Sequence, residues 1–160
     1  MPNITSPLKL YQDVVRENWI DYNGHLNDGY YAVSFGIAVE DFLKHVDLHT
    51  DYLAETDCTI YTAEAHINYL RELKVATKIE VTCQVLSFDA KRIHLYQEMF
   101  NAEEGYLAAT YEGMFLHVNQ AISKVTPMPE DRQATLANIL AEHDKLGTPE
   151  RAGRAIGIKK

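Results

Sequence analysis

Seven residues between Asp21 and Asn27 hold the densest group of reactive side chains in the chain. They supply one carboxylate, two amides, an imidazole and a glycine: Asp21, Asn23, Asn27, His25 and Gly24. A carboxylate in such a stretch can attack a carbonyl or activate a water. The glycine lets the backbone approach a ligand closely. This stretch is therefore the candidate site for acyl chemistry, with Asp21 as its reactive group.

A helix-length apolar segment, Tyr30 to Leu48, begins directly after this stretch. The side chain of Asn27 or Asp28 can cap the first turn of a helix. The first N–H groups of a helix are unpaired donors at a positive dipole end. The N–H groups around Asn27 and Asp28 are thus available to bind an electronegative atom of a ligand.

Structural explanations compete with this chemical one. The sequence Asp-x-Asn-Gly is also a common turn, and Asn23, His25 and Asn27 can hold the turn or cap the helix. The aromatic residues Trp19, Tyr22, Tyr30 and Tyr31 surround the same stretch. They are candidates for an aromatic enclosure that binds a cation, or for ordinary core packing.

The rest of the chain supplies elements that can position this stretch. Residues 8–18 are predicted to form a strand, and the segment ending near Leu48 is apolar nearly all round, as in a buried helix. Four segments then alternate with the two-residue period of strands: 58–70, 78–86, 92–100 and 106–119. Short turns between them favour antiparallel pairing. A last helix begins near Pro129 and ends near Gly147.

This order predicts an α+β fold in which one curved antiparallel sheet of about five strands wraps around a long buried helix, with an additional C-terminal helix. Residues 1–147 are predicted to form a single domain, and residues 148–160 a basic tail that is mobile or lies on a partner. An open sheet of this kind has free edges, so pairing between subunits is expected.

Composition excludes several classes of function. The 160 residues carry a net charge of −8, which argues against a nucleic-acid or membrane-surface binder. Two cysteines without CxxC spacing give no disulfide framework, and no apolar run approaches the ~20 residues needed to span a membrane, so the cytoplasm is the expected location. His45 and His49 are four residues apart, but a polar helix end of this kind is usually solvated, and no metal is expected.

The stretch Asp21-Tyr22-Asn23-Gly24-His25-Leu26-Asn27-Asp28-Gly29-Tyr30-Tyr31 resembles the motif of the hotdog-fold acyl-CoA thioesterases of the 4-hydroxybenzoyl-CoA thioesterase family. The resemblance covers residues 8–120. The segments 19–28, 63–72 (Ala-Glu-Ala-His-Ile-Asn-Tyr-Leu-Arg-Glu) and 91–96 are similar to the betainyl-CoA thioesterases of bacterial carnitine degradation. The resemblance implies a hotdog fold and a homodimer or homotetramer.

The resemblance also implies roles for residues. Asp21 corresponds to the family's catalytic carboxylate, as nucleophile or as general base. Asn23, His25 and Asn27 orient it or contact substrate, and the backbone of Asp28 binds the carbonyl oxygen. The substrate is a small-molecule acyl-CoA, and no cofactor is needed.

Two further groups are expected to contact this substrate. The aromatic residues around the loop suit a quaternary ammonium acyl group. Glu64, His66 and Asn68 share one strand face and are candidates for the acyl pocket of a neighbouring subunit, or for a polar interface between subunits. Coenzyme A is strongly anionic and needs cations. The candidates in this acidic chain are Arg71, Lys74, Lys91 and Arg92.

Two other functions stay open from the sequence. R-specific enoyl-CoA hydratases also carry Asp-x-Asn followed by His, but here His25 follows Asp21 by four residues instead of five and Gly24 stands in place of a proline. A non-catalytic module that holds a small ligand in the same cavity is the third reading.

Overall fold

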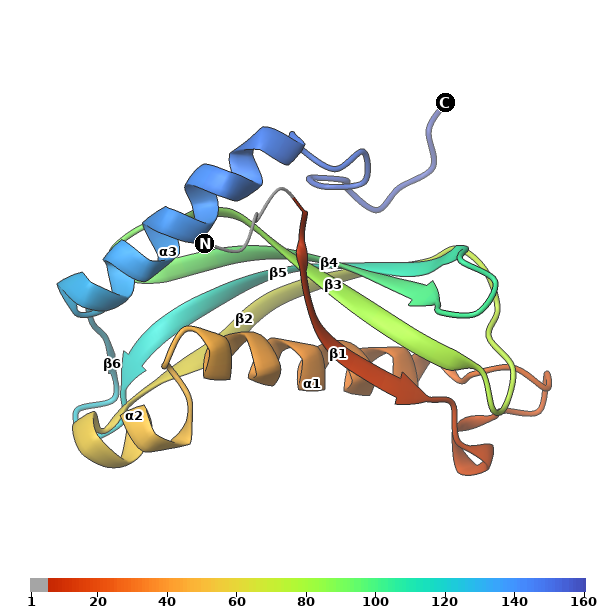
Figure 1. Ribbon diagram of the computed structural model, residues 1–160, viewed down its shortest axis with the longest axis horizontal. Helices are drawn as coiled ribbons and strands as arrows, with labels where there is room; N and C mark the ends of the chain where they lie inside the picture. The colour runs from red at the N-terminus through yellow and green to blue at the C-terminus, as the bar shows by residue number, and fades with distance from the viewer. Residues whose placement is uncertain (1–5) are drawn as a thin grey trace.

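The computed structural model describes residues 6–160 and contains one antiparallel sheet (Figure 1). The strand order is β1-β3-β4-β5-β2, and the short β6 pairs with β5. The strands are β1 (Leu8–Val14), β2 (Cys58–Tyr69), β3 (Lys78–Phe88), β4 (Arg92–Asn101), β5 (Leu107–Asn119) and β6 (Lys124–Val125). The five long strands confirm the predicted antiparallel sheet, with β1 and β2 at its two edges.

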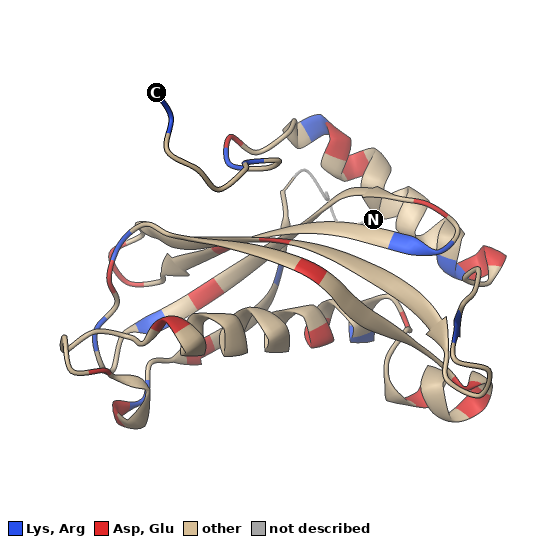
Figure 2. Cartoon of the chain, turned by 180° about the vertical axis from the view of Figure 1, so that it is seen from behind, with Lys and Arg blue, Asp and Glu red and all other residues tan. Residues whose placement is uncertain are grey.

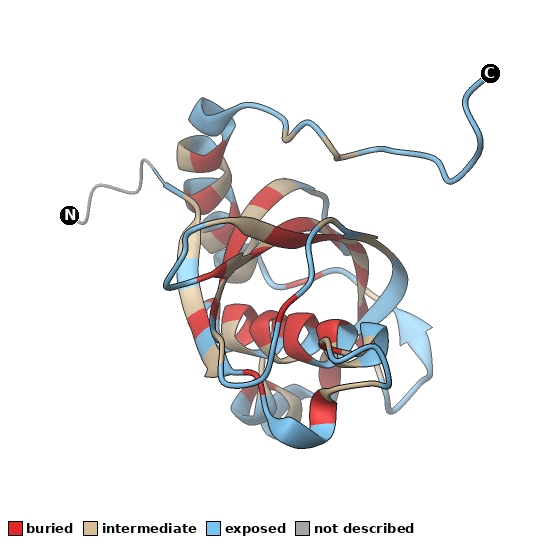
Figure 3. Cartoon of the chain, turned by 90° about the vertical axis from the view of Figure 1, so that its right-hand side faces the viewer, coloured by how far each residue is buried: buried red, intermediate tan, exposed pale blue. Residues whose placement is uncertain are grey.

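Helix α1 (Asp28–His45) lies along the inner face of the curved sheet (Figure 1). Its buried face includes Phe35 and Phe42, and the ring of Phe35 stacks on that of Tyr111 from β5 at a centroid distance of 5.3 Å. The predicted α+β fold with a sheet around a long helix is therefore confirmed. Only one face of α1 is buried, however, because the sheet covers one side of it (Figure 3); Val33 is 46% exposed.

Three element predictions differ from the structure. The predicted strand over 8–18 ends at Val14 and is followed by a 3-10 turn, Glu17–Trp19. The predicted end of the long helix is divided, because the chain turns at Asp47 with a positive φ of 56° and starts a second helix, α2 (Thr50–Thr56). The strand β6 has two residues, which is too short to show the alternation of apolar and polar residues that predicts a strand.

Helix α3 (Glu130–His143) covers part of the outer face of the sheet and is followed by a 3-10 turn, η2 (Asp144–Leu146) (Figure 1). Leu136 and Ile139 supply its buried stripe. His143 is fully buried, and its Nδ1 accepts a hydrogen bond of 2.8 Å from the N–H of Val85. Burial lowers the pKa of His143, so the ring stays neutral and fastens the end of α3 to β3.

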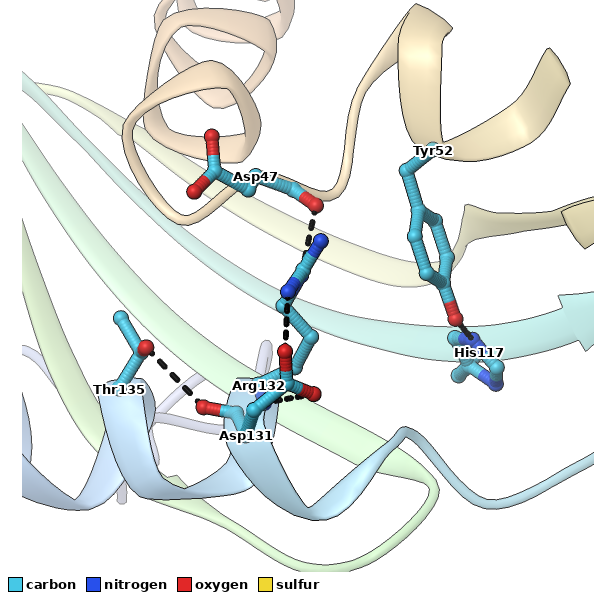
Figure 4. Close-up of polar contacts among 6 residues, drawn as sticks. All are labelled: Asp47, Tyr52, His117, Asp131, Arg132 and Thr135. Carbon is cyan, nitrogen blue, oxygen red and sulfur yellow. Dashed lines mark hydrogen bonds and ion pairs between the residues drawn. The ribbon is translucent and has the colours of Figure 1, made fainter. Parts of the chain in front are cut away.

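A buried polar pair joins α2 to the end of the sheet (Figure 4). His117 is 1% exposed; its Nδ1 donates to the carbonyl oxygen of Thr126 at 2.7 Å, and its Nε2 lies 2.8 Å from the hydroxyl of Tyr52. The Thr126 carbonyl can only accept, so Nε2 of the neutral ring accepts from Tyr52. The guanidinium of Arg132 on α3 donates to the carbonyl oxygen of Asp47 at 2.9 Å and covers the Tyr52 ring.

Gly113 on β5 is the point where the inner face leaves no room for a side chain. A Cβ there would lie 2.6 Å from the Phe115 ring and 2.7 Å from the Tyr111 ring. These two rings flank Gly113 on the side that faces α1. The glycine therefore lets both rings pack against the helix.

We expect Gly113→Ala to destabilise the fold by about 1–3 kcal/mol, because one of the two rings must leave its packed position. Urea unfolding at a fixed protein concentration measures the change. The matched control is Gly36→Ala, since a Cβ at Gly36 on α1 meets nothing within 4 Å; this variant is expected to be as stable as the parent or more stable by up to ~1 kcal/mol. Equal stability of Gly113→Ala and the parent would contradict the packing argument.

We expect Tyr52→Phe to destabilise the fold by about 1–3 kcal/mol, because the buried Nε2 of His117 loses its donor. The same unfolding experiment measures it. Tyr22→Phe removes a hydroxyl that is exposed to solvent, in a residue that is 97% exposed, and is expected to leave stability unchanged. If Tyr52→Phe and the control have the same unfolding midpoint, the prediction is wrong, and water takes the place of the tyrosine hydroxyl as donor to Nε2.

Candidate active site

The loop before α1 is folded by its own hydrogen bonds. The N–H of Asp21 donates to the carbonyl of His25 at 3.0 Å, and the N–H of Gly24 donates to the carbonyl of Asp21 at 3.0 Å. Gly24 has a φ of +78°, a conformation that glycine adopts without strain. Oδ1 of Asp21 accepts from the N–H of Asn23 at 2.9 Å. The turn therefore fixes one carboxylate oxygen of Asp21, while Oδ2 makes no hydrogen bond within residues 6–160.

The first turn of α1 presents one available N–H to this loop. Asn27 is the N-cap residue, and its Oδ1 accepts from the N–H of Gly29 at 2.9 Å. The N–H of Tyr30 donates to the carbonyl of Asn27 at 3.0 Å. Within residues 6–160 the N–H of Asp28 has no acceptor, so it is the free donor at the positive end of the helix.

The loop and the chain that follows β2 enclose a hollow of about 350 Å³. Asp21, His25 and Asp28 line it from the loop side. Tyr31 of α1 and Tyr69 of β2 form a second wall, with their rings in an edge-to-face contact at 5.2 Å. The complete lining is Asp21, Asn23, His25, Leu26, Asp28, Tyr31, Tyr69, Leu70, Arg71 and Glu72. The structure thus brings the predicted catalytic residues into one hollow, with the exception of the Asn27 side chain, which caps the helix.

Both tyrosines of this wall are neutral hydroxyl donors at pH 7. Burial raises the pKa of Tyr31 to about 12, and burial followed by the charge of Asp28 raises the pKa of Tyr69. Tyr31 donates to the carbonyl of Arg71 at 3.3 Å, and Tyr69 to the carbonyl of Asp28 at 3.4 Å. These contacts hold the chain after β2 against the start of α1.

Three carboxylates, on Asp21, Asp28 and Glu72, and one guanidinium line the hollow. The guanidinium belongs to Arg71 and lies 3.8 Å above the ring of Tyr106. Tyr106 itself does not line the hollow. The hollow therefore has an excess of negative charge, which favours a cationic group inside it.

The predicted aromatic enclosure divides into two groups. Trp19 is 4% exposed; its ring stacks on Tyr30 at 5.5 Å and lies 4.6 Å from the guanidinium of Arg16. Neither Trp19 nor Tyr30 lines the hollow, so the two rings support the loop from behind. Tyr22 is 97% exposed and does not line the hollow. Of the four predicted aromatics, Tyr31 alone lines it.

Glu64 and His66 lie on the other side of the sheet. In the β2–β5 pairing His66 lies opposite Glu112, and both face away from α1. They line a separate hollow of about 250 Å³ together with His94, Met114 and Arg154. Within one chain the sheet separates them from Asp21, so the structure does not bring them into the same hollow.

The four predicted cations fall into two pairs at opposite ends of the sheet. Arg71 lines the hollow, and Lys74 is an exposed residue three positions further on. Lys91 lies in the β3–β4 turn and Arg92 is the first residue of β4, where its guanidinium is paired with Asp89 at 2.7 Å. Arg92 is opposite Leu116, whereas the N–H of Arg71 bonds the carbonyl of Ala108 eight residues away along β5. That separation is about 26 Å.

Sequence reasoning missed Tyr69 and Glu72 as lining residues. The signal for Tyr69 was its place as the last residue of a predicted strand, since strand ends commonly carry site residues. Glu72 gave no comparable signal, because it reaches the hollow only through the bend that follows β2.

Known proteins resemble this chain in sequence and in fold. The sequence matches the thioesterase-like superfamily over residues 15–136. It is 32% identical over 151 residues to a betainyl-CoA thioesterase of Pseudomonas aeruginosa, covering 94% of this chain and 95% of the relative. It is 37% identical over 156 residues to an L-carnitine dehydrogenase/betainyl-CoA thioesterase of Rhizobium meliloti, covering 98% of this chain but only 31% of the longer relative.

A solved structure shares nearly the whole fold. A Staphylococcus aureus protein in complex with CoA superposes with a TM-score of 0.88 at 28% identity, over 96% of this chain and 97% of that one. The two curated relatives are named as thioesterases, as the sequence resemblance predicted. Because the family match covers most of the chain and the Pseudomonas relative is matched over 95% of its length, this chain belongs to the thioesterase-like superfamily.

Proposed function

We propose that this protein hydrolyses acyl-CoA thioesters in the hollow beside Asp21. The observation that carries the proposal is the pairing of a carboxylate that has one free oxygen with a helix start that has one free N–H. Thioester hydrolysis needs these two parts, a base or nucleophile and a donor for the oxyanion. The CoA thioester is the substrate, and the mechanism requires no further cofactor.

In the proposed reaction the thioester carbonyl oxygen accepts a hydrogen bond from the N–H of Asp28. Oδ2 of Asp21 removes a proton from a water whose oxygen attacks the carbonyl carbon. The C–S bond then breaks, and the thiolate of CoA receives the proton from Asp21, giving the free acid and CoA. Direct attack by Asp21, with later hydrolysis of an anhydride, uses the same two groups. His25 and Asn23 act as positioning residues for the carboxylate and the substrate.

We propose further that the acyl group is a small cation, as in betainyl-CoA. The excess of carboxylates in the hollow and the paired rings of Tyr31 and Tyr69 favour a quaternary ammonium group. The names of the Pseudomonas and Rhizobium relatives support the same substrate. Trp19, one of the four aromatic residues expected to bind this cation, acts behind the loop instead.

The CoA moiety requires cations that one chain does not gather. We propose that two copies pair through the free edge of β2, whose 12 residues have no partner strand on that side among residues 6–160. Antiparallel pairing about a two-fold axis brings the Cys58 end of one β2 beside the Tyr69 end of the other. Lys91 and Arg92 lie at the Cys58 end, so the second copy carries them toward the hollow that Arg71 and Lys74 flank. The site of action is proposed to be the cytoplasm.

No helix within residues 6–160 is long and apolar enough to cross a membrane. The hydratase alternative uses the same carboxylate, but its Asp-to-His spacing differs from that of the loop here. The binding-module alternative requires no reactive carboxylate. The first experiment below distinguishes hydrolysis from both alternatives.

We expect Asp21→Asn to lower the release of CoA thiol from its best acyl-CoA substrate by 10²–10⁴-fold, the usual contribution of a general base. A thiol reagent follows the release across short, aromatic and betainyl thioesters. Asp51→Asn, an exposed carboxylate on α2, is the control and keeps full activity. No hydrolysis of any thioester by the parent protein would exclude the proposal, and hydration of crotonyl-CoA would favour the hydratase.

A second test compares betainyl-CoA with its uncharged isostere, 3,3-dimethylbutanoyl-CoA, which replaces the nitrogen by carbon. We expect kcat/KM to favour the cation by roughly 5–30-fold, the equivalent of a cation–π contact of about 1–2 kcal/mol. Tyr69→Leu should reduce this ratio several-fold while hydrolysis of the isostere is less affected. Glu150→Gln, a carboxylate outside the hollow, is the control. Equal kcat/KM for the two substrates would rule out a cation-selective hollow.

A further inference from the structure

Residues 155–160 form an irregular segment outside the helices and strands, here called the arm. Ile156 and Ile158 flank a bend at Gly157 and are 90% and 97% exposed, so the arm presents two apolar side chains to solvent. Lys159 and Lys160 follow directly and give the arm a basic end (Figure 2). A short basic segment with exposed apolar side chains is suited to bind an acidic surface that also presents apolar groups.

The chain just before the arm is fastened to the outer face of the sheet. The N–H of Gly153 donates to both carboxylate oxygens of Glu112, at 2.8 and 3.1 Å. Gly153 adopts a φ of +72°, which turns the chain at this contact. His94 lies 2.9 Å from the same carboxylate. The arm therefore starts from a fixed point on β5.

From this point the arm is directed toward the β2 edge. Arg154 lines the outer hollow together with Glu64 and His66 of β2. Figure 3 shows the final residues extending to the side opposite β1, away from the strands of their own sheet. β2 is the edge opposite β1 in the strand order. The arm thus projects toward the edge at which the second copy is proposed to pair.

We propose that the arm crosses this edge and binds the outer face of the second copy. The inference rests on the β2 pairing of the proposed function. Six extended residues span at most ~20 Å, and neighbouring strands lie ~4.8 Å apart, so the arm reaches β5 of the second copy, about three strand spacings away. There the outer hollow offers the apolar side chain of Met114 for the isoleucines and the carboxylate of Glu64 for the lysines.

Pairing along β2 also creates a charge problem that the arm solves. Glu64 lies near the middle of β2, so a two-fold axis through this strand brings the Glu64 side chains of both copies toward each other on the outer face. Like charges at such short range oppose association. The cations of two arms placed over this surface neutralise them, which makes the arm a stabiliser of the pair rather than a part of the chemistry.

The first experiment is an analytical ultracentrifugation dilution series. Ending the chain after Arg154, or introducing Ile156→Asp with Ile158→Asp, is expected to raise the dimer dissociation constant at least 10-fold. The matched control is Ile122→Asp, a 56% exposed isoleucine in the β5–β6 connection, which leaves the constant unchanged. Hydrolysis per site is expected to be unchanged at concentrations at which the shortened chain is still dimeric.

The second experiment locates the arm in the complex. Ile158→Cys combined with Met114→Cys is treated with a short bismaleimide in a mixture of ¹⁴N- and ¹⁵N-labelled protein; the native Cys58 and Cys83 are buried. Cross-linked peptides with mixed labels, between residues 158 and 114, are expected. Peptides with one label only would place the arm on its own sheet and overturn the inference, as would a dimer unaffected by shortening. A monomeric parent chain would refute both the arm and the β2 pairing without bearing on hydrolysis by Asp21.

Discussion

The clamp between the loop before α1 and the chain after β2 is the constraint on which the candidate site depends. The N–H of Leu26 donates to the carbonyl of Leu73 at 2.7 Å, and the N–H of Asn27 donates to the carbonyl of Trp19 at 2.9 Å. Leu26 and Leu73 are both buried, so the hydrogen bond between them is shielded from water. It sets where α1 begins, and therefore where its free N–H points and where Asp21 lies. A site made from a loop gains precision in this way, because its backbone is bound to rigid elements on two sides.

The two faces of the sheet have separate tasks as a result. The inner face packs against α1 and delivers the helix start to one end of the molecule. The outer face carries α3, fastened by the buried ring of His143, and the chain that leads to Glu112. Polar groups on the outer face, such as His94 and Glu112, are thereby separated from the chemistry by one layer of backbone. Within the chain they hold the segment that leads to the arm.

The sequence predicted the parts of this arrangement that depend on local patterns. Alternation of apolar residues located the four long strands, and the cluster from Asp21 to Asn27 was correctly placed before the helix. The division of the long helix could not be predicted, because it depends on Asp47 adopting a left-handed conformation that Arg132 of α3 stabilises through the Asp47 carbonyl. The same limit applies to Trp19 and Glu64. The sequence shows their residue types and the strand face of Glu64, but whether either side chain lies near Asp21 depends on packing between segments that are distant in the sequence.

Charge gives the strongest link between this geometry and a choice of substrate. Coenzyme A is anionic and a betainyl group is cationic, so a site for their thioester must present opposite potentials at its two ends. The hollow beside Asp21 has excess carboxylates, and the cations nearest to it, Arg71 and Lys74, lie at its rim and beyond. Arg71 is held over the ring of Tyr106, with its guanidinium carbon 3.8 Å from the ring centroid. An anionic carrier with a cationic acyl group needs cations and carboxylates in separate places. The excess of carboxylates in the hollow therefore supports the proposed cationic substrate.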